Sequence, residues 1–179
     1  MMTMDMLKHM IYLRYVSWID WFLTRTVNLY KNRTRTIYSN GTKYLQRTYL
    51  KKNGIFPAIF IHRFYASDQD FFPHDHPFEK SWSLILCGSY REIKVVPNKN
   101  WFDTVYKPGM INVISNKEYH KITMLSNPIW TLFFAKKSSK DWGFYDKETG
   151  EHIPWQEYTA RNNNYILDMD GNPSTLLDE

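Results

Sequence analysis

The stretch SWSLILCGSYREIKVV, residues 81–96, sets the fold that we expect for this chain. Its two halves, residues 81–87 and 90–96, are rich in β-branched, aromatic and other apolar side chains, and Gly88 stands between them. Short runs of this composition on either side of a turn residue predict two β-strands joined by a tight turn. The stretch therefore predicts β-structure at the centre of the chain.

Similar runs recur through most of the chain. Turn signals such as Asn53-Gly54, Pro97-Asn98 and Pro108-Gly109 separate them. The predicted strands are residues 44–50, 58–65, 81–87, 90–96, 110–114, 119–124 and 129–135. Many short strands at close spacing, with no helical period between them, indicate an antiparallel sandwich or barrel. We therefore expect a mainly β protein.

The N-terminal part of the chain differs from the rest. Residues 4–30 carry apolar side chains near helical spacing, which predicts one long helix. Residues 11–23 are apolar but interrupted by Arg14 and Asp20, so this stretch is too short and too charged to span a bilayer. We expect the helix to pack on the core or against a partner, with membrane-surface binding as the weaker alternative. The polar, turn-prone residues 31–43 predict a loop.

These elements divide the chain into three parts. Residues 1–43 form the N-terminal helix and loop, residues 44–160 a β-barrel with a C-terminal packing segment, and residues 161–179 a tail. The chain has 179 residues, of which 43% are hydrophobic and 17% aromatic, so one domain with a packed core is expected.

Charge and cysteine content narrow the class of protein. The net charge is +5, but lysine and arginine are spread along the chain, so we expect a solvated basic surface and no nucleic-acid partner. The single cysteine, Cys87, excludes an internal disulfide, and nothing points to an oxidising compartment. We expect a cytoplasmic protein with a small-molecule ligand, and a homodimer is compatible with the sequence.

Three histidines form the candidate metal site. In the motif His74-Asp75-His76, the two imidazoles point to the same face of an extended strand and can reach one ion. Asp75 then points away, and we expect it to orient a ligand or to pair with an arginine. His120 lies in the predicted strand 119–124, where by itself it reads as a buried core histidine.

The order of these residues resembles the two motifs of the cupin superfamily. The first motif has a His-x-His pair followed by a glycine, here His74-Asp75-His76 and Gly88. The second has a Pro-Gly turn and a third histidine, here Pro108-Gly109 and His120. The resemblance covers about residues 44–135 and implies a double-stranded β-helix, the cupin or jelly-roll barrel, with a metal ion inside.

One position departs from the cupin pattern. The glutamate usual in the first motif falls near residues 80–82, where no carboxylate stands, and Glu79 is one or two places early. Either Glu79 coordinates through a shifted register, or three histidines hold the ion without a carboxylate, and we favour three histidines. Within the superfamily this set resembles the cysteine dioxygenase-like thiol dioxygenases. The resemblance implies one divalent ion, with Fe²⁺ favoured and Ni²⁺, Mn²⁺, Co²⁺ or Zn²⁺ as alternatives.

A second resemblance is to small, mostly uncharacterised phage and bacterial cupins. The short motifs shared with them include His74 to Pro77, Gly88/Tyr90/Glu92, His120 to Ile122 and Trp142 to Phe144. This group implies the fold without implying an activity.

Arg47 and His62 are the candidate catalytic residues. Arg47 sits about where the thiol dioxygenases keep a carboxylate-binding arginine, and as an anion clamp it has to point into the barrel. It could instead pair with Asp75 or Glu92. His62 alternates with phenylalanines along its strand, so it is either a buried structural histidine or a barrel-lining residue near the metal.

Three functions remain open at this point. The first is a non-heme iron-dependent dioxygenase that acts on a small anionic or thiol substrate, because three imidazoles leave coordination positions for O₂ and substrate. The second is a non-catalytic cupin that binds or sequesters a small metabolite or nucleotide, since the fold hosts both roles. The third is an interaction protein that works through its basic N-terminal segment.

Overall fold

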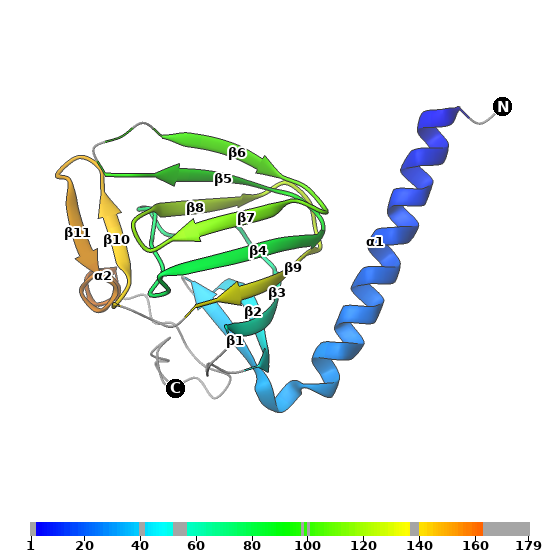
Figure 1. Ribbon diagram of the computed structural model, residues 1–179, viewed down its shortest axis with the longest axis horizontal. Helices are drawn as coiled ribbons and strands as arrows, with labels where there is room; N and C mark the ends of the chain where they lie inside the picture. The colour runs from blue at the N-terminus through cyan, green and yellow to red at the C-terminus, as the bar shows by residue number, and fades with distance from the viewer. Residues whose placement is uncertain are drawn as a thin grey trace.

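A long helix leads into a two-sheet barrel in the computed structural model, which describes residues 3–39, 42–51, 57–97, 99, 101–136 and 140–162 (Figure 1). Helix α1 spans Met4–Leu29, and the hydroxyl of Thr3 caps its first turn by accepting a hydrogen bond from the backbone N–H of Met6 at 3.2 Å. The single long helix expected from the sequence is therefore confirmed. The one-turn helix η1, Lys31–Arg33, follows it.

The larger sheet, sheet A, contains six antiparallel strands. In spatial order these are β1 (Thr34–Ser39), β2 (Thr42–Lys51), β3 (Ala58–Phe64), β9 (Ile129–Ala135), β4 (Lys80–Cys87) and β7 (Ile111–Ser115). Strand β9 lies between β3 and β4 and pairs with both along nearly its whole length.

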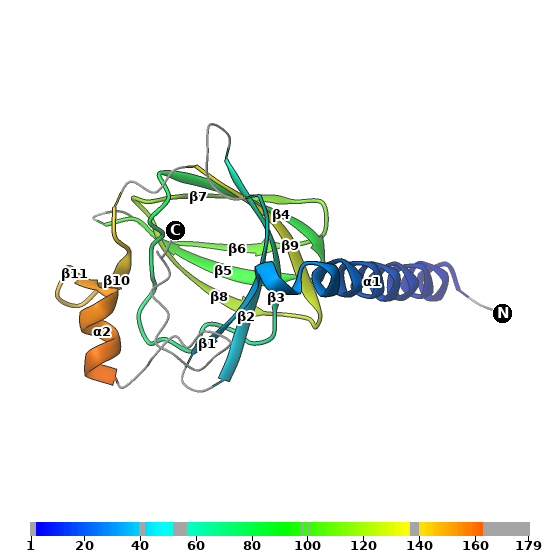
Figure 2. The same ribbon diagram turned by 90° about the horizontal axis from the view of Figure 1, so that it is seen from below.

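A second sheet faces the first across the interior of the barrel (Figure 2). It contains β6 (Phe102–Tyr106), β5 (Tyr90–Val95) and β8 (Tyr119–Met124), in that order. His74 continues this sheet by pairing with His120 on one side and with Phe144 on the other. Beyond it lie the hairpin of β10 (Gly143–Asp146) and β11 (Glu151–Pro154) and the short helix α2 (Trp155–Asn162).

The order of strands is that of a jelly roll. Sheet A holds the order β3-β9-β4-β7, and the facing sheet holds the His74 segment, then β8, β5 and β6. The chain thus alternates between the two sheets from β3 to β9, with only the β5–β6 hairpin staying in one sheet. The expected mainly β fold, a cupin-like double-stranded β-helix with an N-terminal helix, is confirmed.

The turn after β4 explains why a glycine follows the central strand. Gly88 has φ of +76°, and a Cβ atom there would lie 2.3 Å from the carbonyl oxygen of Pro128. Both the positive φ and the close approach of the chain exclude a side chain at this position.

Several elements differ from the sequence-based expectation. The prediction of a loop over residues 31–43 was wrong, because Thr34–Ser39 forms β1 and pairs with β2. Its burial begins as that of an edge strand covered on one side, with Thr34 and Thr36 buried and Arg35 exposed between them. Strands β6, β10 and β11, of 4 or 5 residues each, were also not predicted. The predicted tail lies outside the described residues from position 163 onward.

The core has an inner and an outer part. Between the sheets, apolar residues such as Phe60, Phe64 and Ile122 are buried. On the outer face of sheet A, Leu23 and Val27 of α1 pack against three further buried residues, Ile61, Cys87 and Trp130. Cys87 is fully buried there, as expected for an inert thiol. Among the described residues, no helix is long and apolar enough to cross a membrane.

Candidate metal centre

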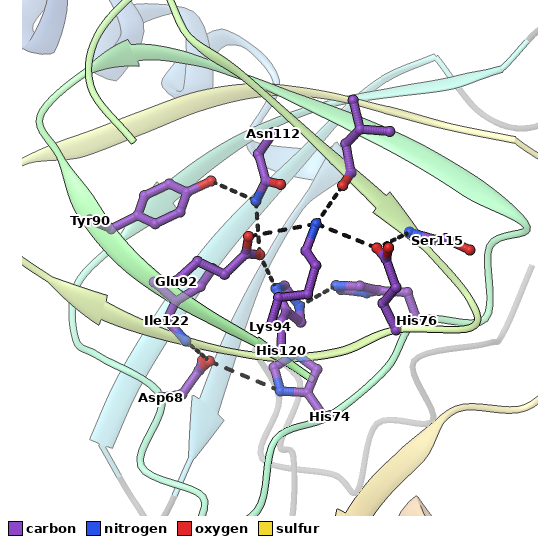
Figure 3. A network of polar contacts seen from close by, with 12 residues as sticks. Asp68, His74, His76, Tyr90, Glu92, Lys94, Asn112, Ser115, His120 and Ile122 are labelled. Atoms are coloured by element: carbon purple, nitrogen blue, oxygen red, sulfur yellow. Dashed lines mark hydrogen bonds and ion pairs between the residues drawn. The ribbon is translucent and has the colours of Figure 1, made fainter. Parts of the chain in front are cut away.

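The barrel interior brings three histidines together. His74, His76 and His120 each offer a ring nitrogen, and these atoms lie within 4.8 Å of one another (Figure 3). The Nε2 atoms of His76 and His120 are 2.8 Å apart. Two nitrogens that bind one ion at about 2.1 Å lie at most about 4.2 Å apart, so small ring rotations complete a metal site.

Backbone pairing fixes the positions of His74 and His120 relative to each other. The backbone N–H of His74 donates to the carbonyl of His120 at 2.9 Å, and the N–H of His120 donates to the carbonyl of His74 at 2.7 Å. Because the segment is extended, His76 lies two residues further along the same face. Residues that are distant in sequence are thereby held side by side by backbone bonds alone.

Asp75 points away from the cluster, as the alternation predicts. It is fully buried, accepts a hydrogen bond from the backbone N–H of Gly143 at 2.7 Å and contacts the ammonium group of Lys140. The expected pairing with an arginine is replaced by a pairing with lysine. Asp75 therefore anchors β10 beside the histidine segment.

A buried carboxylate stands behind His120. Oε1 of Glu92 lies 2.5 Å from Nδ1 of His120, and the side-chain amide of Asn112 donates to the same oxygen at 2.8 Å (Figure 3). Burial raises the pKa of Glu92, but these hydrogen bonds and the nearby Lys94 ammonium outweigh it and hold the pKa below its usual value. A carboxylate that accepts from Nδ1 turns the Nε2 lone pair towards the cluster, as in carboxylate–histidine–metal arrangements.

A second carboxylate lies near His74. Oδ2 of Asp68 is 4.0 Å from Nδ1 of His74 and accepts a hydrogen bond from the backbone N–H of Ile122 at 2.6 Å. The Tyr44 hydroxyl also hydrogen-bonds to Asp68. Asp68 thereby holds the backbone of β8 next to His74.

His74 and His76 are neutral at neutral pH. Burial, partly offset by Asp68, lowers the pKa of His74 to about 4. Burial and the other two imidazoles lower the pKa of His76 well below its usual value. Neutral imidazole is the form that binds a metal ion, so the donor set fits a divalent cation.

Glu79 does not join this set. Its side chain is exposed, and it is absent from the residues that line the barrel cavity. Of the two ligand sets left open by the sequence, the geometry therefore supports three histidines.

Arg47 and His62 lie beside each other on neighbouring strands. Arg47 of β2 pairs in register with His62 of β3, and its Nε–H donates to Nε2 of His62 at 3.0 Å. The His62 ring stacks on Phe60 and tilts against Phe133, with ring centroids 5.9 and 4.9 Å away. Burial and the Arg47 charge lower the pKa of His62 well below its usual value. Arg47 thus pairs with His62 and not with Asp75 or Glu92.

One cavity of about 120 Å³ connects both groups. Its walls are mostly apolar and aromatic, from residues such as Leu45, Phe64 and Ile122. The five predicted site residues all line it: Arg47, His62, His74, His76 and His120. The structure therefore places the arginine and the histidine cluster around a single small space.

Sequence reasoning missed the role of Glu92. Its position on β5 gives no hint of His120, because the two meet only when β5 pairs with β8. The available signal was that Glu92 lies two residues after the fully buried Tyr90 on the same strand and therefore on the same, inward-facing side. An inward carboxylate in a core strand indicates a buried partner.

Comparisons with known proteins leave the family open. No family model matches the sequence, and no curated protein matches it. Hydroxypropylphosphonic acid epoxidase from S. wedmorenis aligns over 56% of this chain and 55% of its own, with a TM-score of 0.44 and 11% identity. The capsular polysaccharide assembling protein CapF from Staphylococcus aureus aligns over 65% of this chain and 31% of its own, with a TM-score of 0.46 and 12% identity.

These similarities are too low to carry an argument about activity. The alignment spans about half of the epoxidase and about a third of CapF. The strand order assigns the fold, and a fold of this kind does not by itself determine an activity.

Proposed function

We propose that the protein is a metal-dependent cupin enzyme, a non-heme iron dioxygenase that acts on a small anionic substrate such as a thiol carboxylate. The observation that carries this proposal is the single cavity lined by both the three-histidine cluster and Arg47. His74, His76 and His120 would hold the ion. When bound, the ion would supply the redox chemistry and the open coordination positions for O₂ and substrate.

Arg47 supplies the charge that an anionic substrate requires. Its Nε–H donates to His62, and within the described residues its two terminal amino groups form no other hydrogen bond or ion pair. A guanidinium presents these groups as a fork that suits a carboxylate. His62 accepts the hydrogen bond that holds this side chain, and the centre of the Phe60 ring lies 5.4 Å from the guanidinium carbon.

The cavity walls favour a substrate with a short apolar body. Phe64, Phe133 and Ile122 surround the space between the arginine and the cluster. An apolar wall excludes water and strengthens the attraction between Arg47 and an anion. A cavity of about 120 Å³ suits a molecule of a few heavy atoms.

Oxygen uptake by the iron-loaded protein tests the proposal. Thioglycolate is the anionic probe, and 2-mercaptoethanol is a thiol of similar size without the carboxylate. We expect uptake with thioglycolate or a related thiol carboxylate and much weaker uptake with 2-mercaptoethanol. No uptake across a panel of small thiol acids would contradict the dioxygenase. Ligands that bind and are recovered unchanged would then assign the non-catalytic binding role.

A further inference from the structure

The N-terminal half of α1 is an exposed apolar surface. Every side chain from Met4 to Arg14 is exposed, and within the described residues none of them forms a hydrogen bond or ion pair with the barrel. The large apolar residues in this half are Met4, Met6, Leu7, Met10, Ile11, Tyr12 and Leu13. Both views of the ribbon show this end of the helix extending beyond the barrel (Figures 1 and 2).

The C-terminal half of α1 uses only one of its sides. Leu23 and Val27, four residues apart, are buried against sheet A. Trp18 and Trp21 remain 57% and 53% exposed. A helix that is apolar on all sides is normally buried between two partners. The barrel of the same chain provides only one of them.

The outer face of sheet A is also partly uncovered. Strand β4 carries Trp82 and Leu84 on this face, although its inward side is already buried in the core. On the neighbouring β7, Ile111 and Val113 are 57% and 40% exposed. The inward side chains of these two strands include the buried polar residues Ser81, Ser83 and Asn112, whereas the outward ones form an exposed apolar patch. An exposed apolar patch of this kind indicates a second covering layer.

We propose that these two surfaces cover each other in a homodimer. In each chain, α1 lies between its own sheet A and the outer face of β4 and β7 of the second copy. Helix α1 already packs on this same face of its own sheet, through Leu23, Val27 and Ile61. The dimer therefore extends an existing helix-on-sheet contact, and a two-fold axis satisfies both surfaces of both chains at once.

The exposed area is large enough for a stable interface. A standard interface buries about 800 Å² per partner. The exposed apolar side chains of α1 include three methionines and several aromatic residues, and a large aromatic residue buries about 150–250 Å². Together with the apolar patch on β4 and β7, they provide a surface of that order. A membrane would cover α1 but would leave the patch on β4 and β7 in water, whereas a second copy of the chain covers both surfaces.

The mass of the full chain in solution gives the first test. Sedimentation equilibrium is expected to give a mass near twice the chain mass of 21.6 kDa. Met6→Glu with Met10→Glu alters only exposed helix positions, and it is expected to yield a folded monomer. Lys8→Gln, a change at an exposed polar position of the same helix, is the matched control and is expected to leave the dimer intact. A monomeric wild-type chain at all concentrations would overturn the proposal.

Altering the sheet gives the second arm. Ile111→Glu with Val113→Glu is expected to yield a monomer with an unchanged circular dichroism spectrum. Ile111→Thr with Val113→Thr keeps the β-branched shape and serves as the second variant if the charged one fails to fold. A dimer that survives the threonine pair with unchanged dissociation constant contradicts the use of this face.

Mixing the helix and sheet variants distinguishes the proposed packing from direct pairing of the two helices. In the mixture, the unaltered helix of the sheet variant meets the unaltered sheet of the helix variant, so one of two contacts is restored. A dimer is therefore expected to reappear at concentrations where neither variant dimerises alone. No dimer in the mixture overturns the arrangement. Monomeric wild-type protein that sediments with anionic vesicles would assign α1 to a membrane surface instead.

Discussion

The three-histidine cluster and His62 lie in the same barrel, but the side chains beside their rings carry opposite charges. His120 and His62 are both almost fully buried, with 2% and 4% of their surface exposed. Nδ1 of His120 faces the carboxylate of Glu92, whereas Nε2 of His62 accepts a hydrogen bond from the guanidinium of Arg47. The residue type and the burial are the same, and the partner differs.

The difference predicts different roles for the two rings. A carboxylate behind one ring nitrogen leaves the other lone pair available and adds negative charge that favours a cation. A guanidinium in front of the ring occupies the lone pair and repels a cation. We therefore expect His120 and its two neighbours to bind metal, and His62 to hold Arg47 in place.

Removing one cluster histidine should produce the largest effect. His76→Ala deletes a ring whose Nε2 lies 2.8 Å from Nε2 of His120. Unlike His120 and His74, within the described residues His76 has no carboxylate beside it that the change would leave without its partner. We expect metal content after dialysis to fall from about one ion per chain to near zero, an affinity loss of at least about 10³-fold. Elemental analysis measures it. His62→Gln, which still accepts from Arg47, is the control and should keep its metal. Full metal content in His76→Ala would refute the three-histidine site.

The pH dependence of stability should expose the buried neutral rings. In the metal-free protein the pKa of His74 is about 4, below the usual 6.5, because the ring is buried. Between pH 6.5 and 4 the unfolded chain binds more protons than the folded one, so the free energy of unfolding falls as the pH falls. His74 alone accounts for about 3 kcal/mol across this window.

Urea unfolding of the metal-free protein at a series of pH values measures this dependence. His62→Gln should make it shallower, because burial and Arg47 lower the pKa of His62 as well. Bound metal should change the pH range over which the free energy of unfolding falls, because protons and metal compete for the same nitrogens. A stability that stays flat between pH 6.5 and 4 would contradict the neutral state of these rings.

Weakening the carboxylate behind His120 should have a smaller effect than removing a ligand. Glu92→Gln keeps the shape and an oxygen that can accept from Nδ1, but it removes the negative charge. Metal affinity is expected to fall about 10–100-fold, as for other partners of metal-binding histidines. Competition with a chelator measures it.

A matched control separates this effect from a general loss of charge. Glu118 lies 3.4 Å from the ammonium of Lys94, which also lies 3.8 Å from Glu92. Glu118→Gln therefore changes the same lysine's surroundings without touching His120 and should keep wild-type metal affinity. Equal losses in both variants would assign the effect of Glu92 to the overall charge.

The sequence predicted the parts of the fold that depend on local pattern. The strands that are rich in apolar and aromatic residues and bounded by turn signals, such as β4 and β9, were found within one residue of their bounds. The edge strand β1 was missed because its polar residues resemble a loop, and only pairing with β2 makes it a strand. Local pattern also cannot show which strands become neighbours.

The same limit applies to the site. His74 and His76 share a face for local reasons, so their common direction follows from sequence alternation. Glu92, by contrast, is 28 residues away from His120 in the sequence and reaches it only because β5 pairs with β8. For Arg47, the sequence left open a role as an anion clamp and a pairing with Asp75 or Glu92, and the register of β2 with β3 places it beside His62. Contacts set by register between distant strands need the structure.

Changing Arg47 should have the smallest of these effects. It should affect substrate binding beside His62 and leave the three-histidine cluster unchanged. Arg47→Met keeps an unbranched apolar stem but removes the guanidinium, whose carbon lies 5.4 Å from the centre of the Phe60 ring. We expect wild-type metal content, because Arg47 does not contact the cluster nitrogens. For thioglycolate we expect the KM of oxygen uptake to rise about tenfold, the loss of one charge-assisted hydrogen bond. For 2-mercaptoethanol the KM should not change, because this thiol offers no carboxylate. A rise of the same size for both thiols would mean that Arg47 supports the shape of the cavity and does not bind the anion.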